Sequence, residues 1–263
     1  MTTYQHHFID IITGSLLAYL SFIIFPYRKK DFIYRNFHVA NIYFLSGWIV
    51  ILIAILVDQF FGKVGLVLLW PSFMILLIGY HYQKNSIFFL KSKAGNIPWF
   101  KKIFYLPYLL LYQLFWTFLK KNRTPVEIIP RLYISSRPDR ESLKDFRVDK
   151  TTIVYDLSAE MEELTIIKDT VNYYSVPFLD IGTFDIQETQ KLVSEITQHY
   201  QQLPPDGKIL IHCTMGFTRS SVIGILVIKN ILSLPLTEAI TMMKTHNKHA
   251  VIHTYLKDFL KKF

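Results

Sequence analysis

Hydrophobic and polar positions follow different patterns in the two halves of the chain. The first half holds four long apolar stretches, at residues 8–25, 40–57, 64–80 and 103–119. A membrane-spanning helix needs about 20 mostly apolar residues, so the first three stretches predict spans. A short polar turn separates the second from the third and predicts a helical hairpin over residues 40–80. We therefore expect residues 1–121 to form a multi-pass membrane-anchoring region.

The fourth stretch, residues 103–119, is interrupted by a proline and a glutamine and has lysine pairs at both ends. Basic residues prefer the cytoplasmic side of a membrane, which suits the loops 26–39 and 81–102 if three spans precede this stretch. A fourth span would place Lys120 and Lys121 outside. We expect an interfacial or re-entrant segment rich in aromatic residues, with a fourth span as the alternative. The remainder of the chain is then cytoplasmic.

From residue 122 onward, charged residues become frequent and the apolar runs become short. Runs rich in β-branched residues alternate with stretches whose apolar positions recur at helical spacing. The predicted strands are residues 127–129, 131–134, 152–155, 173–176 and 208–212, and the predicted helices are residues 188–201, 218–232 and 237–245. This alternation predicts an α/β domain over residues 122–263, with a central sheet flanked by helices.

The charge distribution narrows the range of functions. Of the 29 Lys+Arg and 20 Asp+Glu residues, residues 1–121 hold 12 and 3, whereas residues 122–263 hold 17 and 17. The whole excess of +9 therefore lies between apolar stretches, which is typical of membrane flanks. A nucleic-acid-binding domain would carry that charge as a patch on its folded surface. Membrane lipid, and not nucleic acid, is the expected partner.

One segment carries recognisable chemistry: an apolar strand at 208–212, a short turn containing Gly216, and a helix that begins near Arg219. Backbone N–H groups of such a turn point inward at the helix N-terminus and form a site for a phosphate-sized anion. Cys213, the single cysteine, lies at the base of this positive field, which stabilises the reactive thiolate. The planar fork of Arg219 can hold two phosphoryl oxygens, and Ser220 can donate a hydrogen bond to the sulfur.

The motif His212-Cys213-x5-Arg219-Ser220 resembles the active-site loop of the cysteine-based protein tyrosine phosphatase superfamily, specifically its dual-specificity branch. The resemblance covers residues 127–263, with Asp156 where asparagine is more usual, and none of the membrane-anchoring region. It implies a dual-specificity-phosphatase-like fold. It also implies hydrolysis of phosphomonoesters through a phosphocysteine intermediate.

The same resemblance implies a role for each residue of the motif. Cys213 is the nucleophile, His212 orients it, and Ser220 assists the departure of the sulfur in the second step. The loop that binds the phosphoryl group comprises Thr214, Met215, Gly216, Phe217, Thr218 and Arg219.

A general acid is expected on a movable loop upstream of the cysteine. Asp180 is the first candidate because it follows a predicted strand and a proline, and Gly182 gives the loop freedom to close. Asp185 is the alternative, although it also suits the N-cap of the predicted helix 188–201.

No cofactor and no metal are expected. His246, His249 and His253 recur at near-helical spacing, but no cysteine or carboxylate clusters with them in the sequence. A metal site needs a set of such ligands. We therefore interpret the three histidines as helix surface.

The substrate class is open at this stage. None of the five residues between Cys213 and Arg219 is basic, which argues against a highly charged substrate. The resemblance favours phosphoproteins carrying phosphotyrosine, phosphoserine or phosphothreonine. The alternative is a lipid phosphomonoester, of a phosphatidylglycerophosphate-like or phosphoinositide kind. A third hypothesis is a catalytically inactive module that binds phosphate, and the oligomeric state is not predicted.

Overall fold

The computed structural model describes residues 8–24, 34–120 and 124–263. The chain divides into two compact units, Met1–Ser86 and Ile87–Phe263. The basic residues 28–30, which were used to orient the first predicted span, lie outside the described residues. The predicted boundary at residues 121 and 122, between the membrane-anchoring region and the α/β domain, lies outside them as well.

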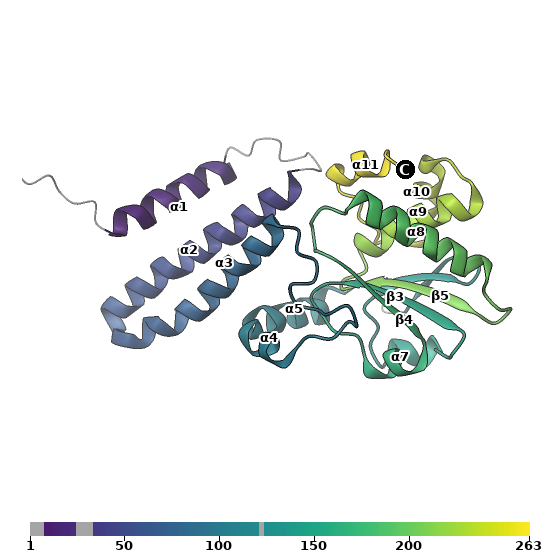
Figure 1. Cartoon of the computed structure of the whole chain (residues 1–263), viewed down its shortest axis with the longest axis horizontal. Coiled ribbons are helices and arrows are strands. Elements are labelled where there is room, and N and C mark those ends of the chain that lie inside the picture. Colours follow the sequence, from purple (N-terminus) through teal and green to yellow (C-terminus); the bar gives the residue numbers. More distant parts are fainter. Residues whose placement is uncertain (1–7, 25–33, 121–123) are drawn as a thin grey trace, which may run out of the picture. The chain divides into compact units, whose positions relative to one another are not determined.

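The first unit is helical. It contains α1 (Phe8–Ile24), α2 (Arg35–Phe61), the 3₁₀ helix η1 (Gly62–Leu68) and α3 (Leu69–Gln83). Helices α2 and α3 lie side by side and are joined by η1 (Figure 1), in agreement with the hairpin predicted over residues 40–80. The Ser72 hydroxyl donates to the Gly47 carbonyl at 3.0 Å, and the rings of Tyr43 and Tyr82 stack with centroids 5.2 Å apart. These contacts add to the apolar packing between the two helices.

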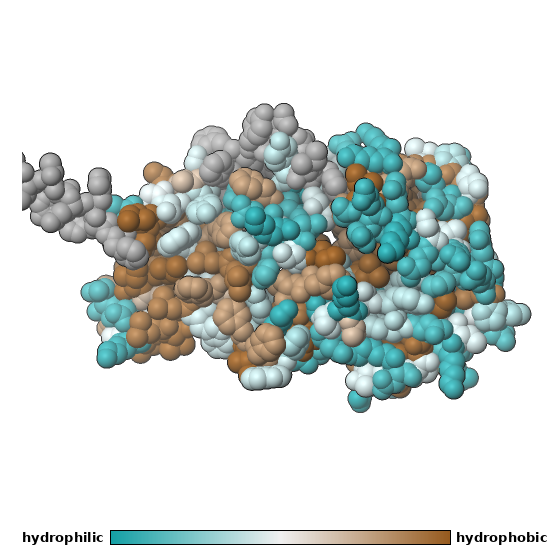
Figure 2. Space-filling view, viewed as in Figure 1, coloured by the Kyte–Doolittle hydropathy of each residue, from teal (hydrophilic) through white to brown (hydrophobic). Residues whose placement is uncertain are grey.

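Large apolar side chains are exposed along this unit, and Figure 2 shows hydrophobic surface over the same helices. Among the described residues, only the stretch Arg35–Gln83, which comprises α2, η1 and α3, is long and apolar enough to cross a membrane by length and composition. Helix α1 has 17 residues and α5 has 14, so both are shorter than a typical span. The structure therefore contains one candidate span, and helix length does not support the several passes predicted from the sequence.

The second unit is a mixed α/β fold built on a five-stranded sheet. Its strands are β1 (Val126–Ile129), β2 (Leu132–Ser136), β3 (Thr152–Ser158), β4 (Asn172–Phe178) and β5 (Lys208–Cys213). Their order is β1-β2-β5-β3-β4, with β1 antiparallel to β2 and the other pairs parallel. Each predicted strand corresponds to one of these, which confirms the central sheet. The parallel strands place their carboxyl ends, including that of β5, at one edge.

Helices flank the sheet on both faces. They are α6 (Ser142–Asp145), α7 (Thr165–Thr170), α8 (Ile186–Gln201), α9 (Arg219–Leu232), α10 (Leu236–His246) and α11 (Thr254–Leu260). In Figure 1, α8 to α11 lie on one side of the sheet and α7 lies on the other. The three predicted helices correspond to α8, α9 and α10. Helix α9 packs against α8, α10 and β5, and its residues from Arg219 to Ile228 are all buried, so the site begins at the most buried helix of the unit.

Two more helices of this unit precede the sheet in the chain. Tyr105 separates α4 (Trp99–Phe104) from α5 (Leu106–Leu119), where the sequence predicted one interfacial segment. Pro107 stands in the first turn of α5, where the missing N–H of proline has no partner to lose. One side of α5 is buried and aromatic, with Tyr108, Tyr112 and Trp116. The other side is exposed and apolar, with Leu110, Leu114 and Phe118.

Lysines at the ends of α4 and α5 bind carboxylates of the sheet domain. Lys102 Nζ lies 2.6 Å from an oxygen of Glu162, and Lys120 forms an ion pair with Asp139. From the sequence these lysines were expected to flank a membrane segment. A basic residue beside an apolar run has the same sequence pattern whether it lies at a membrane surface or pairs with a carboxylate in a folded domain. Their ion pairs join α4 and α5 to the sheet domain, within the unit that begins at Ile87.

Candidate active site

The turn predicted to bind a phosphoryl group joins β5 to α9. Strand β5 ends at Cys213 and α9 begins at Arg219, so five residues form the loop. Gly216 has a φ of +79°, and a Cβ placed there would lie 2.6 Å from the backbone nitrogen of Ser136. Glycine alone tolerates both that left-handed backbone and so close an approach. Gly216 therefore lets the loop curl against the end of β2.

Cys213 is buried under this loop, with hydrogen-bond donors close to its sulfur. The Gly216 N–H donates to Sγ at 3.3 Å, and the Ser220 hydroxyl oxygen lies 3.5 Å from Sγ. These donors and the N-terminus of α9 direct positive partial charge towards the sulfur. The structure thus brings Cys213, Gly216 and Ser220 together.

The guanidinium of Arg219 is buried between two carboxylates. Nη1 donates to the two oxygens of Glu160 at 2.9 and 3.1 Å, and Nη2 lies 3.3 Å from Oδ1 of Asp180. Burial acts to lower the pKa of Arg219, but the charges of Glu160 and Asp180 raise it well above its usual value. The guanidinium is therefore a fixed, charged donor beside the loop. We call Arg219, Glu160 and Asp180 the front cluster.

Glu160 is a member of the site that the sequence motifs did not reveal. It follows β3 and is fully buried, and the Thr214 hydroxyl donates to its Oε2 at 2.7 Å. Burial raises the pKa of Glu160 although Arg219 acts to lower it, and the charge of Asp180 adds to the rise. The available signal was a carboxylate just after a strand parallel to β5, because the carboxyl ends of parallel strands meet at one edge of the sheet.

Asp180 reaches the front cluster from the loop that follows β4. Its side chain is 27% exposed, and it accepts a hydrogen bond from the Tyr112 hydroxyl of α5 at 3.3 Å, a contact that the sequence did not predict. The next residue, Ile181, has a φ of +57°. This conformation is strained for a β-branched residue, and such strain clusters at functional sites. A strained and partly open loop therefore places the carboxylate beside Arg219.

The alternative acid, Asp185, has a different place. Its side chain accepts a hydrogen bond from the Glu188 N–H at 2.9 Å and caps the N-terminus of α8. A carboxylate is favourable there because it meets unpaired N–H groups and the helix dipole. The N-cap role anticipated for Asp185 is confirmed. Of these two aspartates, Asp180 is the one that contacts Arg219.

Beside Cys213 lies a second buried cluster of charged and polar side chains, in which His212 stands between two carboxylates. His212 Nε2 lies 2.9 Å from Oε2 of Glu163, and Nδ1 lies 3.9 Å from Oδ1 of Asp156. On its other oxygen, Asp156 meets Lys91 Nζ at 2.5 Å. Burial raises the pKa of Asp156, but the charges of Lys91 and His212 bring it below its usual value. We call Lys91, Asp156, His212 and Glu163 the rear cluster.

Three members of the rear cluster are also the one metal-ligating group found among residues 8–24, 34–120 and 124–263. Ligand atoms of Asp156, Glu163 and His212 lie within 4.8 Å of one another. The ammonium of Lys91 already compensates Asp156, and it would repel a divalent cation at short range. We therefore assign the group to charge compensation within the protein. The exposed residues His246, His249 and His253 lie outside it.

The rest of the loop presents no charge of its own. Met215, Phe217 and Thr218 are half-buried, and Thr214 is fully buried. The Phe217 carbonyl accepts hydrogen bonds from the Val251 N–H at 3.0 Å and from a serine hydroxyl of α9 at 2.8 Å. These contacts tie the loop to the helical side of the domain.

No protein-family model matches the chain, and no curated protein matches its sequence. Among solved structures it is similar to Tk-PTP in the active form, at 20% identity over 53% of this chain and 95% of that one, with a TM-score of 0.46. Human DUSP28 matches at 18% identity over 54% and 94%, with a TM-score of 0.43. PTPMT1 in complex with PI(5)P matches at 18% identity over 52% and 95%, with a TM-score of 0.42. At identities and TM-scores this low, the neighbours do not identify an activity for this chain. Any proposed activity must be argued from the residues of its own site.

Proposed function

We propose that this protein is a phosphatase of the cysteine-dependent, dual-specificity type, which hydrolyses phosphomonoesters through a phosphocysteine intermediate. One observation carries the proposal: Cys213 Sγ, with donors from Gly216 and Ser220, shares a loop with Arg219, whose guanidinium contacts Asp180. A nucleophile, inward-facing amides, a fixed guanidinium and a carboxyl group in one site meet the needs of phosphoryl transfer.

In the first step, Sγ of Cys213 attacks phosphorus on the side opposite the leaving oxygen. The S–P bond forms as the P–O bond to the alcohol or phenol breaks, and Asp180 gives its proton to the leaving oxygen. The loop amides and Arg219 bind the other three phosphoryl oxygens, where negative charge develops. Phosphoryl oxygens then replace the carboxylate of Asp180 as partners of the guanidinium.

In the second step, the carboxylate of Asp180 takes a proton from water as the water oxygen attacks phosphorus. The S–P bond breaks, and the electron pair returns to Cys213 as the thiolate. Ser220 stabilises that thiolate by donating a hydrogen bond, which makes sulfur a better leaving group. The products are the alcohol and inorganic phosphate, and no cofactor enters the scheme.

We place this activity at a membrane. In this proposal the apolar stretches at residues 8–25, 40–57 and 64–80 anchor the chain in the bilayer, with Arg35–Gln83 as the candidate span, and the phosphatase domain is cytoplasmic. The exposed apolar side chains of α1, α2 and α3 support it, as does the excess of basic residues beside the apolar stretches. The anchor would raise the effective concentration of any substrate held at the same surface.

Phosphoproteins carrying phosphotyrosine, phosphoserine or phosphothreonine are the first substrate class, on the resemblance of the motif. One observation favours a lipid phosphomonoester as the second class. Helix α5 exposes Leu110, Leu114 and Phe118, while Tyr112 of the same helix contacts Asp180. An exposed apolar helix can lie in a membrane interface, which would bring the acid loop close to lipid headgroups.

The test is phosphate release by the full-length protein in mixed micelles, with Cys213→Ser as the blank. A phosphotyrosine peptide and phosphatidylglycerophosphate are offered side by side. A hundredfold preference in kcat/KM for either, about 2.7 kcal/mol of transition-state discrimination, identifies the substrate class. The absence of Cys213-dependent release from both substrates would contradict the proposal and favour the inactive phosphate-binding module.

A further inference from the structure

Lys91 is a fully buried cation on a segment that carries no part of the predicted phosphatase motif. It lies in the connection between α3 and α4, upstream of residue 122. Its ammonium lies 2.5 Å from Oδ2 of Asp156 and donates to the Ser158 carbonyl at 2.8 Å. Both partners belong to β3, at the edge of the sheet where the catalytic loop begins.

Asp156 connects this lysine to the active site. In the pairing of β3 with β5, Asp156 is directly opposite His212, the residue before the nucleophile. Its Oδ1 accepts from the Ser158 N–H at 2.8 Å, and its Oδ2 accepts from the Tyr173 hydroxyl at 2.7 Å. The side chain is thus held by three donors besides its approach to His212. Only one of them, Lys91, brings a full positive charge.

Asp156 is a carboxylate in a buried position of β3. An asparagine is neutral and can be buried with hydrogen bonds alone, whereas a buried carboxylate needs a compensating charge. Lys91 supplies that charge from 65 positions upstream. The buried carboxylate of Asp156 and the buried ammonium of Lys91 therefore each compensate the charge of the other.

We propose that Lys91 is a positioning residue of the active site, which fixes Asp156 and, through Asp156 and His212, the catalytic thiolate of Cys213. This inference rests on the proposed phosphatase function. The catalytic unit then begins before residue 122 and includes the segment around Lys91.

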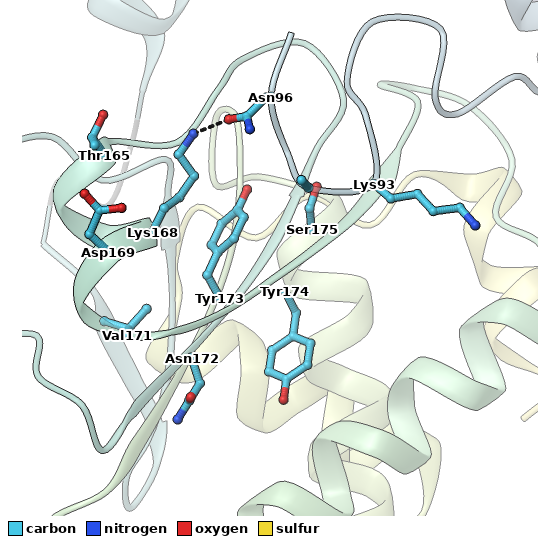
Figure 3. A pocket seen from close by; sticks show the side chains of 11 residues that line it. Lys93, Asn96, Thr165, Lys168, Asp169, Val171, Asn172, Tyr173, Tyr174 and Ser175 are labelled. Carbon is cyan, nitrogen blue, oxygen red and sulfur yellow. Dashed lines mark hydrogen bonds between the residues drawn. The ribbon is translucent and has the colours of Figure 1, made fainter.

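The segment around Lys91 is also held by apolar packing, because Leu90 is fully buried and the ring of Phe89 contacts those of Tyr105 and Tyr108. Asn96 accepts a hydrogen bond from Lys168 of α7 at 2.5 Å, and the Ile97 N–H donates to a carboxylate oxygen of Glu162. Between the segment, α7 and β4 there is a cavity of about 640 Å³, part of which Figure 3 shows with the Lys168–Asn96 contact. Lys93, which lines the cavity, is exposed.

The experiment compares Lys91→Met, Asp156→Asn and the double variant in the full-length protein, with Lys93→Met as the matched control. The readouts are kcat, KM and the pH dependence of alkylation of Cys213 by iodoacetamide. Cys213 is the chain's single cysteine, so alkylation reports on it alone. Thermal unfolding is followed for every variant, and Lys91→Gln replaces Lys91→Met if the latter does not fold.

We expect Lys91→Met to lower kcat about a hundredfold, as a small misplacement of reacting groups can, with little change in KM. The midpoint of alkylation should move to higher pH, because an uncompensated Asp156 beside His212 disfavours the thiolate. Glu163 and Tyr173 also face this cluster and are unchanged in every variant. Lys93→Met should match the unchanged protein.

The double variant is decisive, because removing both charges leaves no unpaired ion. It should recover most of the kcat and the original alkylation midpoint, as rescue of a pair requires. A Lys91→Met protein with unchanged kcat and midpoint would overturn the inference, and so would a double variant as impaired as the single one. Alkylation does not require turnover, so a chain that releases no phosphate would break the proposed function while leaving this inference testable.

Discussion

The front and rear clusters both hold a buried cation against a carboxylate inside the protein. In the front cluster Arg219 follows the loop between β5 and α9 directly and contacts Glu160 and Asp180. In the rear cluster the cation is Lys91, from a segment outside the motif. Asp180 is 27% exposed, whereas the rear cluster is closed to solvent.

The difference in exposure suits the two clusters to different roles: the front cluster can exchange a partner for substrate, and the rear cluster holds its side chains in place. The front cluster has one carboxylate that can leave, because Asp180 lies on a strained loop and meets Arg219 on a single nitrogen. Substrate oxygens can take its place. The rear cluster has no such open position, since its side chains contact one another and backbone within the core. The front cluster therefore suits a change of hydrogen-bond partners when substrate binds, whereas the contacts of the rear cluster stay the same.

The largest expected effect comes from Arg219→Lys. A single ammonium cannot reproduce the fork that reaches Glu160 and a phosphoryl group together. We expect kcat to fall about 10³-fold, in line with the loss of a donor to developing charge. Steady-state kinetics on the phosphotyrosine peptide measures it. A loss smaller than that of Lys91→Met would reverse the proposed ranking of the two clusters.

The second test separates the two aspartates. Asp180→Asn should lower kcat about 10²-fold and remove the pH dependence of a general acid. Asp185→Asn is its control, because asparagine caps a helix as well as aspartate does and leaves α8 intact. The pH–rate profiles of both variants decide the matter. Equal losses would mean that the acid has been assigned wrongly.

The third test probes how α5 bears on the open side of the front cluster. Tyr112→Phe removes the hydroxyl that donates to Asp180 and keeps the buried ring. Loss of this one long and partly buried hydrogen bond predicts a fall in kcat of about fivefold and a loss of stability of about 1 kcal/mol or less. Kinetics at several pH values and thermal unfolding report the two quantities separately. An unaltered kcat would show that α5 has no part in placing the acid.

The smallest effect concerns the ion pair that ties α5 to the sheet domain. Burial acts to raise the pKa of Asp139, but the hydrogen bonds and charge of Lys120, with hydrogen bonds from Ser142, bring it from 3.8 to about 2. Because the folded value lies below the unfolded one, the stability gained is present above about pH 4. It is lost as the pH falls towards 2.

Asp139→Asn should therefore cost less than about 1 kcal/mol at pH 7, since the pair is partly exposed. The cost should vanish near pH 2. Denaturant unfolding of both proteins at pH 7, 4 and 2 measures the difference. A difference that persists at pH 2 would assign the effect to packing instead of charge.

The sheet and the catalytic loop were accessible from the sequence because their signals are local. Alternating β-branched runs predicted all five strands, and the spacing of Cys213 and Arg219 predicted the loop with its helix. Gly216 was expected within the turn, and its φ of +79° shows why the turn requires glycine.

The sequence did not reveal the roles of Glu160 and Lys91, because their partners lie 59 and 65 positions away along the chain. Such contacts exist only after the sheet has aligned its carboxyl ends, and no periodicity records them. The attachment of α5 to the sheet domain was not predicted for another reason. Hydropathy reports that an apolar face is to be buried, but not whether lipid or protein will cover it. Paired with Asp139, Lys120 belongs to the domain; alone in the sequence, it resembled a membrane flank.

The lone sulfur of the active site has a consequence for oxidative stress. A thiolate such as the one proposed at Cys213 is readily oxidised to a sulfenic acid, which a neighbouring thiol usually captures as a disulfide. These 263 residues contain no second cysteine to do so. Capture is left to a backbone nitrogen or to a thiol from outside, such as glutathione. After a burst of peroxide, recovery of the enzyme would then depend on the reducing capacity of its surroundings.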